Sequence, residues 1–145
     1  MHEIDRSVLV GYSAEQLYTL VEEVESYPAF LPWCGGTEVE HRDETHTRAA
    51  ITIQFKGIRQ RFSTSNTRSP PTRIDMKLVE GPFRSLDGTW SFQPLADDAC
   101  KVRFQLRYEF ASRLLEKLVG PVFEHIASTF VDSFVKRAAQ VYGPR

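Results

Sequence analysis

The sequence predicts an α+β protein in which a curved antiparallel sheet of about seven strands wraps around one long C-terminal helix. Residues 37 to 110 form short alternating segments separated by turn-forming residues, which is typical of an antiparallel meander. Residues 112 to 142 instead carry apolar side chains at the helical period. The 145 residues, of which 41% are hydrophobic, are enough for one domain with its own core, which we expect to span residues 1–145.

The first 36 residues predict a strand followed by two short helices. Apolar and polar side chains alternate over residues 3 to 10, which indicates a half-buried strand. The segment Ser13-Ala-Glu-Gln16 is a capping box, so we expect a helix to begin at Ser13. A second short helical turn is expected from Ser26, before Pro32 and the Gly35-Gly36 pair break it.

The strands that follow should expose one face and bury the other. We expect turns at residues 42–45, 56–57, 69–71, 81–82 and 96–98. The last strand alternates most regularly, and its apolar side is Cys100, Val102, Phe104, Leu106, Tyr108 and Phe110. The sheet therefore has an apolar face that needs a covering layer.

The C-terminal helix is the only remaining element that can cover that face. Its apolar stripe comprises Leu114, Leu115, Leu118, Val119, Val122, Phe123, Ile126, Ala127, Phe130, Val131, Phe134, Val135 and Ala138. We expect a kink at Gly120-Pro121, because proline lacks the amide donor. A twisted sheet touches a helix closely only along a line, so the two layers can enclose a cavity. Aromatic side chains, at 12% of the residues, could equally fill that space.

Composition excludes several classes of function. The 18 basic and 19 acidic residues nearly cancel, so total charge indicates neither nucleic acid nor anionic membrane as a partner. The N-terminal residues are charged and no apolar run reaches the length of a membrane helix, so we expect a cytoplasmic protein. Cys34 and Cys100 have no C-x-x-C spacing and are expected to be reduced and buried.

No pattern indicates catalysis or metal binding. His41 and His46 flank a polar turn, and no histidine has the spacing of a metal ligand. Cys34 has no neighbouring activating charge, and paired-carboxylate, Ser/His/Asp and phosphate-loop patterns are lacking. A cyclase-like or hydrolytic enzyme would need a buried polar pair in the cavity, whereas the inward positions are almost all apolar. We therefore expect a protein with no catalytic residues, no metal and no cofactor.

Several motifs carry a resemblance over nearly the whole length. They are Tyr27-Pro-Ala-Phe-Leu-Pro-Trp-Cys34, Phe55-Lys-Gly-Ile58, the segment from Val79 to Phe92, and the helix from Phe123 to Phe134. In order and spacing the chain resembles the START-like, or helix-grip, superfamily. The similarity is to its coenzyme-Q-binding members and to the RatA-like ribosome-association toxins, and these motifs do not separate the two branches.

The resemblance implies a hydrophobic tunnel that binds ubiquinone, another isoprenoid or a lipid without catalysis, in support of respiration. One alternative is a toxin that binds the large ribosomal subunit and blocks subunit association. A second is a polyketide-cyclase-like enzyme. The implied partners are thus a quinone or lipid ligand, with peripheral membrane contact and the large ribosomal subunit as open alternatives.

Apolar positions on the expected inner surfaces are the candidate ligand-binding residues. They are Phe30, Leu31, Trp33, Phe55, Met76, Leu78, Phe83, Leu86, Trp90, Phe104, Val122, Phe123, Ile126 and Phe130. The segment from Phe30 to Cys34 is either a rigid elbow or a functional element, and the latter would be the rim of the cavity mouth or an apolar tip that faces a membrane or partner. Glycines in the segment from Gly81 to Gly88 indicate a bent or bulged strand start, while Phe83 and Leu86 are interpreted as gates above the tunnel. Trp90 is expected either in the wall of the pocket or in the hydrophobic core, and the sequence does not distinguish these two positions.

Five basic residues fall on outward positions of two strands, namely Arg59, Arg61, Lys101, Arg103 and Arg107. An ordinary charged sheet surface is the favoured interpretation. If they formed one patch, it would suit ribosomal RNA phosphates or anionic headgroups, with binding that weakens as salt rises.

Overall fold

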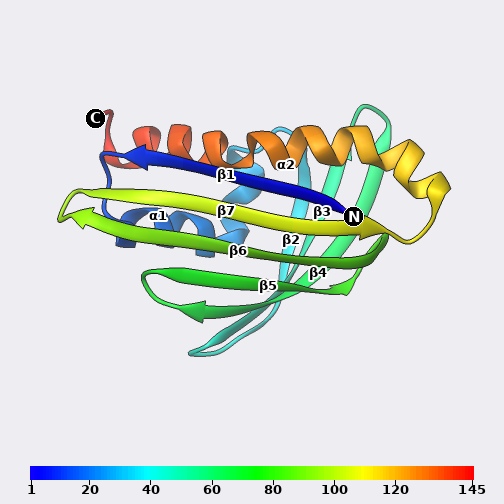
Figure 1. The fold of residues 1–145 in the computed structure, drawn as a ribbon, viewed down its shortest axis with the longest axis horizontal. Helices are drawn as coiled ribbons and strands as arrows, with labels where there is room; N and C mark the ends of the chain where they lie inside the picture. Colours follow the sequence, from blue (N-terminus) through cyan, green and yellow to red (C-terminus); the bar gives the residue numbers. More distant parts are fainter.

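Seven antiparallel strands form one sheet in the computed structural model, which describes residues 1–145 (Figure 1). The spatial order is β1-β7-β6-β5-β4-β3-β2, so every neighbouring pair is a hairpin except β1 and β7. The strands are β1 (His2–Val10), β2 (Cys34–Arg42), β3 (His46–Phe55), β4 (Ile58–Ser69), β5 (Arg73–Glu80), β6 (Phe83–Ala96) and β7 (Ala99–Phe110). The expected α+β fold class and the antiparallel meander are confirmed.

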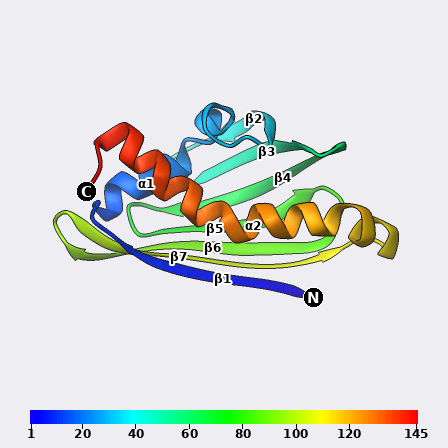
Figure 2. The ribbon, with the colours of Figure 1, turned by 90° about the horizontal axis from the view of Figure 1, so that it is seen from above.

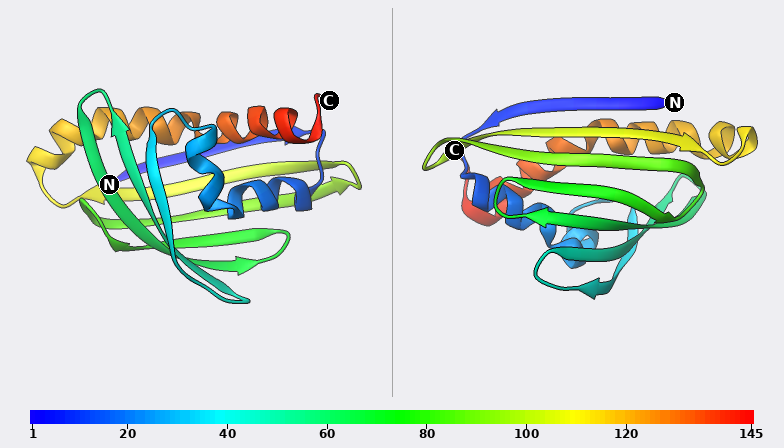
Figure 3. Two further views of the ribbon diagram at one scale, coloured as in Figure 1. Left: turned by 180° about the vertical axis from the view of Figure 1, so that it is seen from behind. Right: turned by 60° about the horizontal axis from the view of Figure 1, so that its bottom comes forward.

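The two short helices, α1 (Ala14–Glu22) and η1 (Val24–Ala29), connect β1 to β2. Ser13 caps α1 as predicted: its hydroxyl accepts from the Gln16 amide at 3.0 Å, and the Gln16 side chain accepts from the Ser13 amide at 2.9 Å. The second helix is a 3₁₀-helix that begins at Val24, two residues before the predicted start. Seen from behind, α1 lies beside the C-terminal part of the long helix (Figure 3).

The long helix α2 (Arg113–Tyr142) lies across the concave face of the sheet (Figure 2). The sheet twists strongly, so that β2, β3 and β4 run across the direction of β1, β7 and β6 (Figure 1). The inward residues of β7 are all buried, from Cys100 at 0% exposure to Phe110 at 4%. The core therefore lies between this face and α2, as the alternation predicted.

The start of α2 bends as predicted, but it is less buried than predicted. The helix continues through Pro121, but its first turns bend away from the rest of the axis (Figure 1). Leu114 and Leu118, expected in the buried stripe, are 66% and 55% exposed. The reason is that Leu114 and Leu118 lie on the face of these turns that is turned away from the sheet, whereas Val119 is 2% exposed and Glu116 bonds His2 of β1 at 2.9 Å. No helix is both long and apolar enough to span a membrane.

The predicted turns all lie between strands, and the segment after Glu80 bends as expected. Gly81 has a φ of 153°, and a Cβ there would lie 2.6 Å from the Cβ of Phe62. A register shift between Phe83 and Ser85 shows that β6 begins with an irregularity of the bulge type. The backbone at Gly81 thus passes directly against β4.

Candidate ligand-binding cavity

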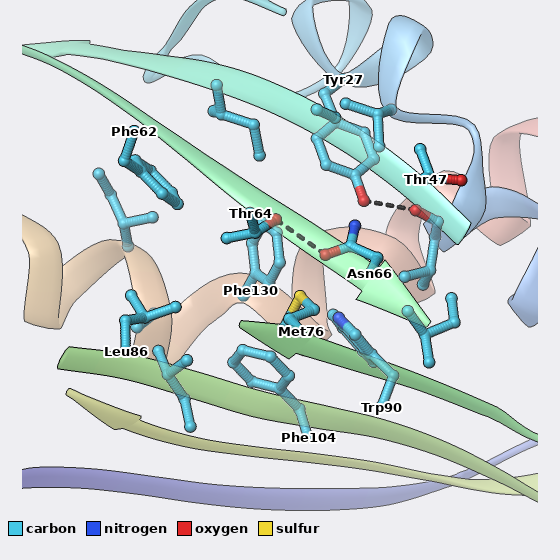
Figure 4. A pocket seen from close by; sticks show the side chains of 18 of the residues that line it. Tyr27, Thr47, Phe62, Thr64, Asn66, Met76, Leu86, Trp90, Phe104 and Phe130 are labelled. Atoms are coloured by element: carbon cyan, nitrogen blue, oxygen red, sulfur yellow. Dashed lines mark hydrogen bonds between the residues drawn. The ribbon is translucent and has the colours of Figure 1, made fainter. Parts of the chain in front are cut away.

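A cavity lies between the inner face of the sheet and α2 (Figure 4). Of the 23 residues that line it, 18 are hydrophobic, and its volume is about 80 Å³. Eight of the predicted ligand-binding residues line it, namely Trp33, Met76, Leu86, Trp90, Phe104, Phe123, Ile126 and Phe130. Strand alternation supplies those from β5, β6 and β7, and helical spacing supplies those from α2.

The other six predicted residues do not line the cavity. They are Phe30, Leu31, Phe55, Leu78, Phe83 and Val122. Leu31 is 1% exposed and belongs to the core, while Phe55 stacks on the exposed His125 ring at the edge of α2. Leu78 and Val122 are half-buried and pack against the core from outside the cavity. Periodicity predicted that these six side chains point inward, but it could not predict which side chains of the opposite layer they meet.

Different residues of the segment from Phe30 to Cys34 have different roles. Trp33 lines the cavity, so this part of the segment forms cavity wall. Phe30 packs on Phe134 at 5.3 Å between ring centroids, with the Arg137 guanidinium 5.0 Å above its ring. Phe30 therefore anchors the elbow to the C-terminal half of α2.

Phe83 lies one layer behind the cavity wall. Its ring packs on Phe123 at 4.9 Å, on Phe110 at 5.1 Å and on Phe62 at 5.9 Å between centroids. Since Phe62 and Phe123 both line the cavity, Phe83 supports two wall residues from behind. Trp90, at 1% exposure, belongs to both wall and core, with its ring 4.6 Å from that of Phe104.

The cavity is small for a long ligand. Sites for drug-sized molecules have volumes of roughly 300 to 1,000 Å³, and an engineered apolar cavity of about 150 Å³ binds benzene. At about 80 Å³, the cavity as it stands holds only a small group. A quinone ring with part of its tail needs more space than the cavity offers as it stands.

One end of the cavity is polar, which the sequence interpretation missed. The five polar lining residues are Glu22, Thr47, Thr64, Asn66 and Arg68. In Figure 4, Thr47 and Asn66 lie toward one end, Phe62 and Leu86 toward the other, and the Thr64 hydroxyl donates to Asn66 Oδ1 at 2.8 Å. The expectation that inward positions are almost all apolar is therefore wrong at this end. The available signal was the period-2 run of Thr64, Asn66 and Arg68 after Phe62.

An ion-pair network closes the polar end. Arg42 bonds Glu25 through two nitrogens at 2.9 and 3.0 Å, and its Nε lies 3.1 Å from Glu22 Oε1. The same Glu22 oxygen lies 3.9 Å from Arg68 Nη1, where the two side chains are 18% and 13% exposed. The Glu22–Arg68 pair is thus the buried polar pair that the sequence interpretation had not found.

The two cysteines are free thiols, with Cys34 half-buried and Cys100 buried. Burial raises the pKa of Cys34, and it raises the pKa of Cys100 to about 11. Both therefore carry the proton at neutral pH, which disfavours nucleophilic chemistry. No three His, Cys, Asp or Glu side chains gather where they could hold a metal ion.

The basic residues on the outer face do not form one patch. Arg59 and Arg61 lie on β4, which β5 and β6 separate from β7, where the other three lie. Ion pairs also join Arg103 to Asp5 at 2.7 Å and Arg61 to Glu38 at 2.9 Å. This arrangement agrees with an ordinary charged sheet surface.

Comparisons with known proteins agree with the fold. A family model described as "Polyketide cyclase / dehydrase and lipid transport" matches residues 10–135. The chain is 44% identical over 143 residues to the ribosome association toxin RatA of Vibrio cholerae, with 99% of each covered. It is 29% identical to the mitochondrial coenzyme Q-binding protein COQ10 homolog B of Xenopus laevis, covering 97% of this chain and 59% of that protein. A START superfamily protein from Mycobacterium smegmatis matches with a TM-score of 0.77 at 22% identity, covering 97% and 99% of the two chains.

Proposed function

The chain belongs to the START-like family of polyketide cyclases, dehydrases and lipid-transport proteins, and we propose that it binds an apolar small molecule between its sheet and α2. The observation that carries the proposal is the cavity, whose wall is hydrophobic at 18 of 23 residues. Burial of apolar ligand surface supplies roughly 25 cal/mol per Å² toward affinity. A quinone or another isoprenoid is the favoured ligand, because a coenzyme Q-binding protein is among the relatives.

Titration with a short-chain ubiquinone tests this proposal. Binding should be saturable, and mass spectrometry of an organic extract should show the same compound chemically unchanged. Conversion of the ligand to a new compound would indicate the cyclase-like alternative instead. Absence of saturable binding, together with an extract free of lipid, would refute the binding function.

Ala127→Leu offers a sharper test, because Ala127 is a small cavity-lining residue on α2 that is 3% exposed. The added carbons occupy the cavity, so affinity should fall roughly tenfold or more. Ala139→Leu is the matched control, since Ala139 lies on α2 outside the cavity wall. Equal affinity of the two variants would show that the ligand binds elsewhere.

A second candidate function is association with the large ribosomal subunit, as in a RatA-like toxin. It is favoured by the 44% identity to a ribosome association toxin over 99% of both chains. Sucrose-gradient profiles after overexpression should then show fewer joined ribosomes and more free subunits. Unchanged profiles would remove this candidate, and profiles with Ala127→Leu would reveal whether the effect requires an open cavity.

A further inference from the structure

We propose that the polar end of the cavity binds the oxygen-bearing head of the apolar ligand, with Arg68 and Thr47 donating hydrogen bonds to a carbonyl or carboxylate oxygen. The inference rests on the proposed binding function and specifies the chemistry that the site recognises. The ligand class is an apolar body with a terminal hydrogen-bond acceptor. Neutral quinones and fatty acids share this chemistry.

The first argument is the set of unsatisfied polar atoms at this end. Arg68 Nε and Thr47 Oγ1 are buried donors with no hydrogen-bond partner, and the Tyr18 hydroxyl, outside the cavity wall, is in the same state. Glu22 Oε1 differs, because Arg42 Nε lies 3.1 Å from it. Thr47 is only 2% exposed, so solvent cannot readily satisfy its hydroxyl. Buried polar groups in native proteins are rarely left unpaired, and each one calls for a specific explanation. A ligand oxygen within the cavity supplies the missing acceptor.

The second argument is the way the sheet brings these groups together. Thr47 on β3 is the register partner of Asn66 on β4, and Arg68 follows two residues later on the same face. Thr47 and Arg68 are therefore diagonal neighbours, a separation that a long side chain spans. Both line the cavity. Two donors from different strands thus reach the same end of an otherwise apolar space.

The third argument is the distribution of charge. Arg42 is held by Glu25 and also lies close to Glu22, whereas Arg68 has Glu22 as its ion-pair partner at 3.9 Å. The Tyr18 hydroxyl also lies near this guanidinium, but Arg68 has more N–H donors than these two protein groups use, so donors remain for another acceptor. Two arginines and two glutamates sum to zero charge, which suits a neutral carbonyl head. A carboxylate head gains a charge-assisted bond to Arg68 but is repelled by the Glu22 carboxylate beside it.

The experiment compares ligands with and without oxygen on two variants. Thr47→Val removes the hydroxyl while keeping the shape, and Arg68→Gln removes the guanidinium. Each should weaken binding of a short-chain ubiquinone or of dodecanoate about tenfold, and leave binding of the hydrocarbon probe diphenylhexatriene unchanged. Thr52→Val and Arg61→Gln are the controls, because neither residue lines the cavity.

The outcomes separate this inference from the proposed function. If the hydrocarbon binds but neither variant changes affinity for the oxygen-bearing ligands, the head-group inference is wrong while the binding function stands. An equal loss for the hydrocarbon would assign the two residues a structural role and would also overturn it. If the wild-type protein binds none of the three ligands, the binding function itself fails.

Two further readouts sharpen the result. A structural account of Thr47 expects Thr47→Val to keep or raise the melting temperature, because it deletes an unpaired buried hydroxyl. Our proposal expects that same variant to lose affinity, so stability and binding should move in different directions. Comparing dodecanoate with its methyl ester distinguishes the head groups: a preference for the free acid indicates a carboxylate ligand, and equal binding indicates a carbonyl.

Discussion

Phe123 occupies the centre of the aromatic packing between sheet and helix. Its ring lies 4.7 Å from that of Tyr108 and 4.9 Å from that of Phe83, and the side chain is 4% exposed. Edge-to-face contacts of this kind add to the free energy of burying the ring. Its inward position was predictable from helical spacing, whereas its partners come from β6 and β7 and became known only from the fold.

Phe123→Ala should lower the free energy of unfolding by about 3 to 5 kcal/mol, because it leaves a void in a packed region. Denaturant unfolding followed by circular dichroism measures this change. Leu114→Ala, at a position 66% exposed on the same helix, should change stability by less than about 0.5 kcal/mol. Similar losses for both variants would contradict the packing described for Phe123.

Asp75 is an acidic residue whose lowered pKa could not be predicted from the sequence. Its carboxylate accepts hydrogen bonds from Arg73 Nε at 2.8 Å and from the Thr89 hydroxyl at 2.9 Å. The hydrogen bond from Arg73 is the main cause of a lowered pKa at Asp75. Because the folded-state pKa lies below the unfolded value of about 3.9, the stabilisation is present above that pH and is lost as pH falls through the folded pKa.

Carbon-detected NMR titration should therefore place the midpoint of Asp75 below 3.8. Arg73→Gln should raise that midpoint, while Arg84→Gln should leave it unchanged. The difference in unfolding free energy between wild type and Arg73→Gln should shrink as the pH drops below about 4. A midpoint insensitive to Arg73→Gln would argue against the ion pair.

At the scale of elements, a local signal, the capping box at Ser13, located the start of α1, whereas the helical period placed the start of α2 near residue 112. Ser13 and Ser112 each accept a hydrogen bond from a backbone amide in the first helical turn, at 3.0 and 3.1 Å. Such caps act over three residues, so the sequence alone suffices to find them. The exposure of Leu118 has a different origin, because it depends on which face of α2 the sheet covers.

Ser13→Ala should lower the free energy of unfolding by about 1 kcal/mol, since it removes the acceptor for the Gln16 amide. Thermal unfolding measures the effect. Ser26→Ala is the control, because the Ser26 side chain caps no helix. A loss at Ser26 as large as that at Ser13 would show that the capping box is not the cause.

At the scale of the whole molecule, packing is uneven between the centre of the sheet and the free end of α2. β7 pairs on both sides, with β1 and β6, and its inward side chains are buried. The first turns of α2 expose Leu114 and Leu118 and reach β1 through the His2–Glu116 bond, and Pro121 removes one helical hydrogen bond there. The two regions should therefore open at very different free energies.

Hydrogen exchange should detect this difference. Amides of β7 should exchange only through global unfolding, and those of residues 113–119 should be protected at least about 100-fold less. Peptide-level mass spectrometry or NMR provides the measurement, with residues 126–138 of α2 as the internal comparison. Equal protection along the whole helix would show that contacts such as the buried Val119 and the His2–Glu116 bond hold the first turns as firmly as the rest.

The sequence by itself determined the class of fold, the order of elements, and the buried face of most elements, because periodicity and capping are local properties of the chain. It also identified eight of the cavity-lining residues. Only the tertiary structure decided that Phe83 stands behind the wall and that Glu22, Thr47 and Arg68 meet at one end. Glu22, Thr47 and Arg68 come from α1, β3 and β4. Hydrophobic periodicity defines the side of an element on which a side chain lies, but it does not define which other elements pack against that side.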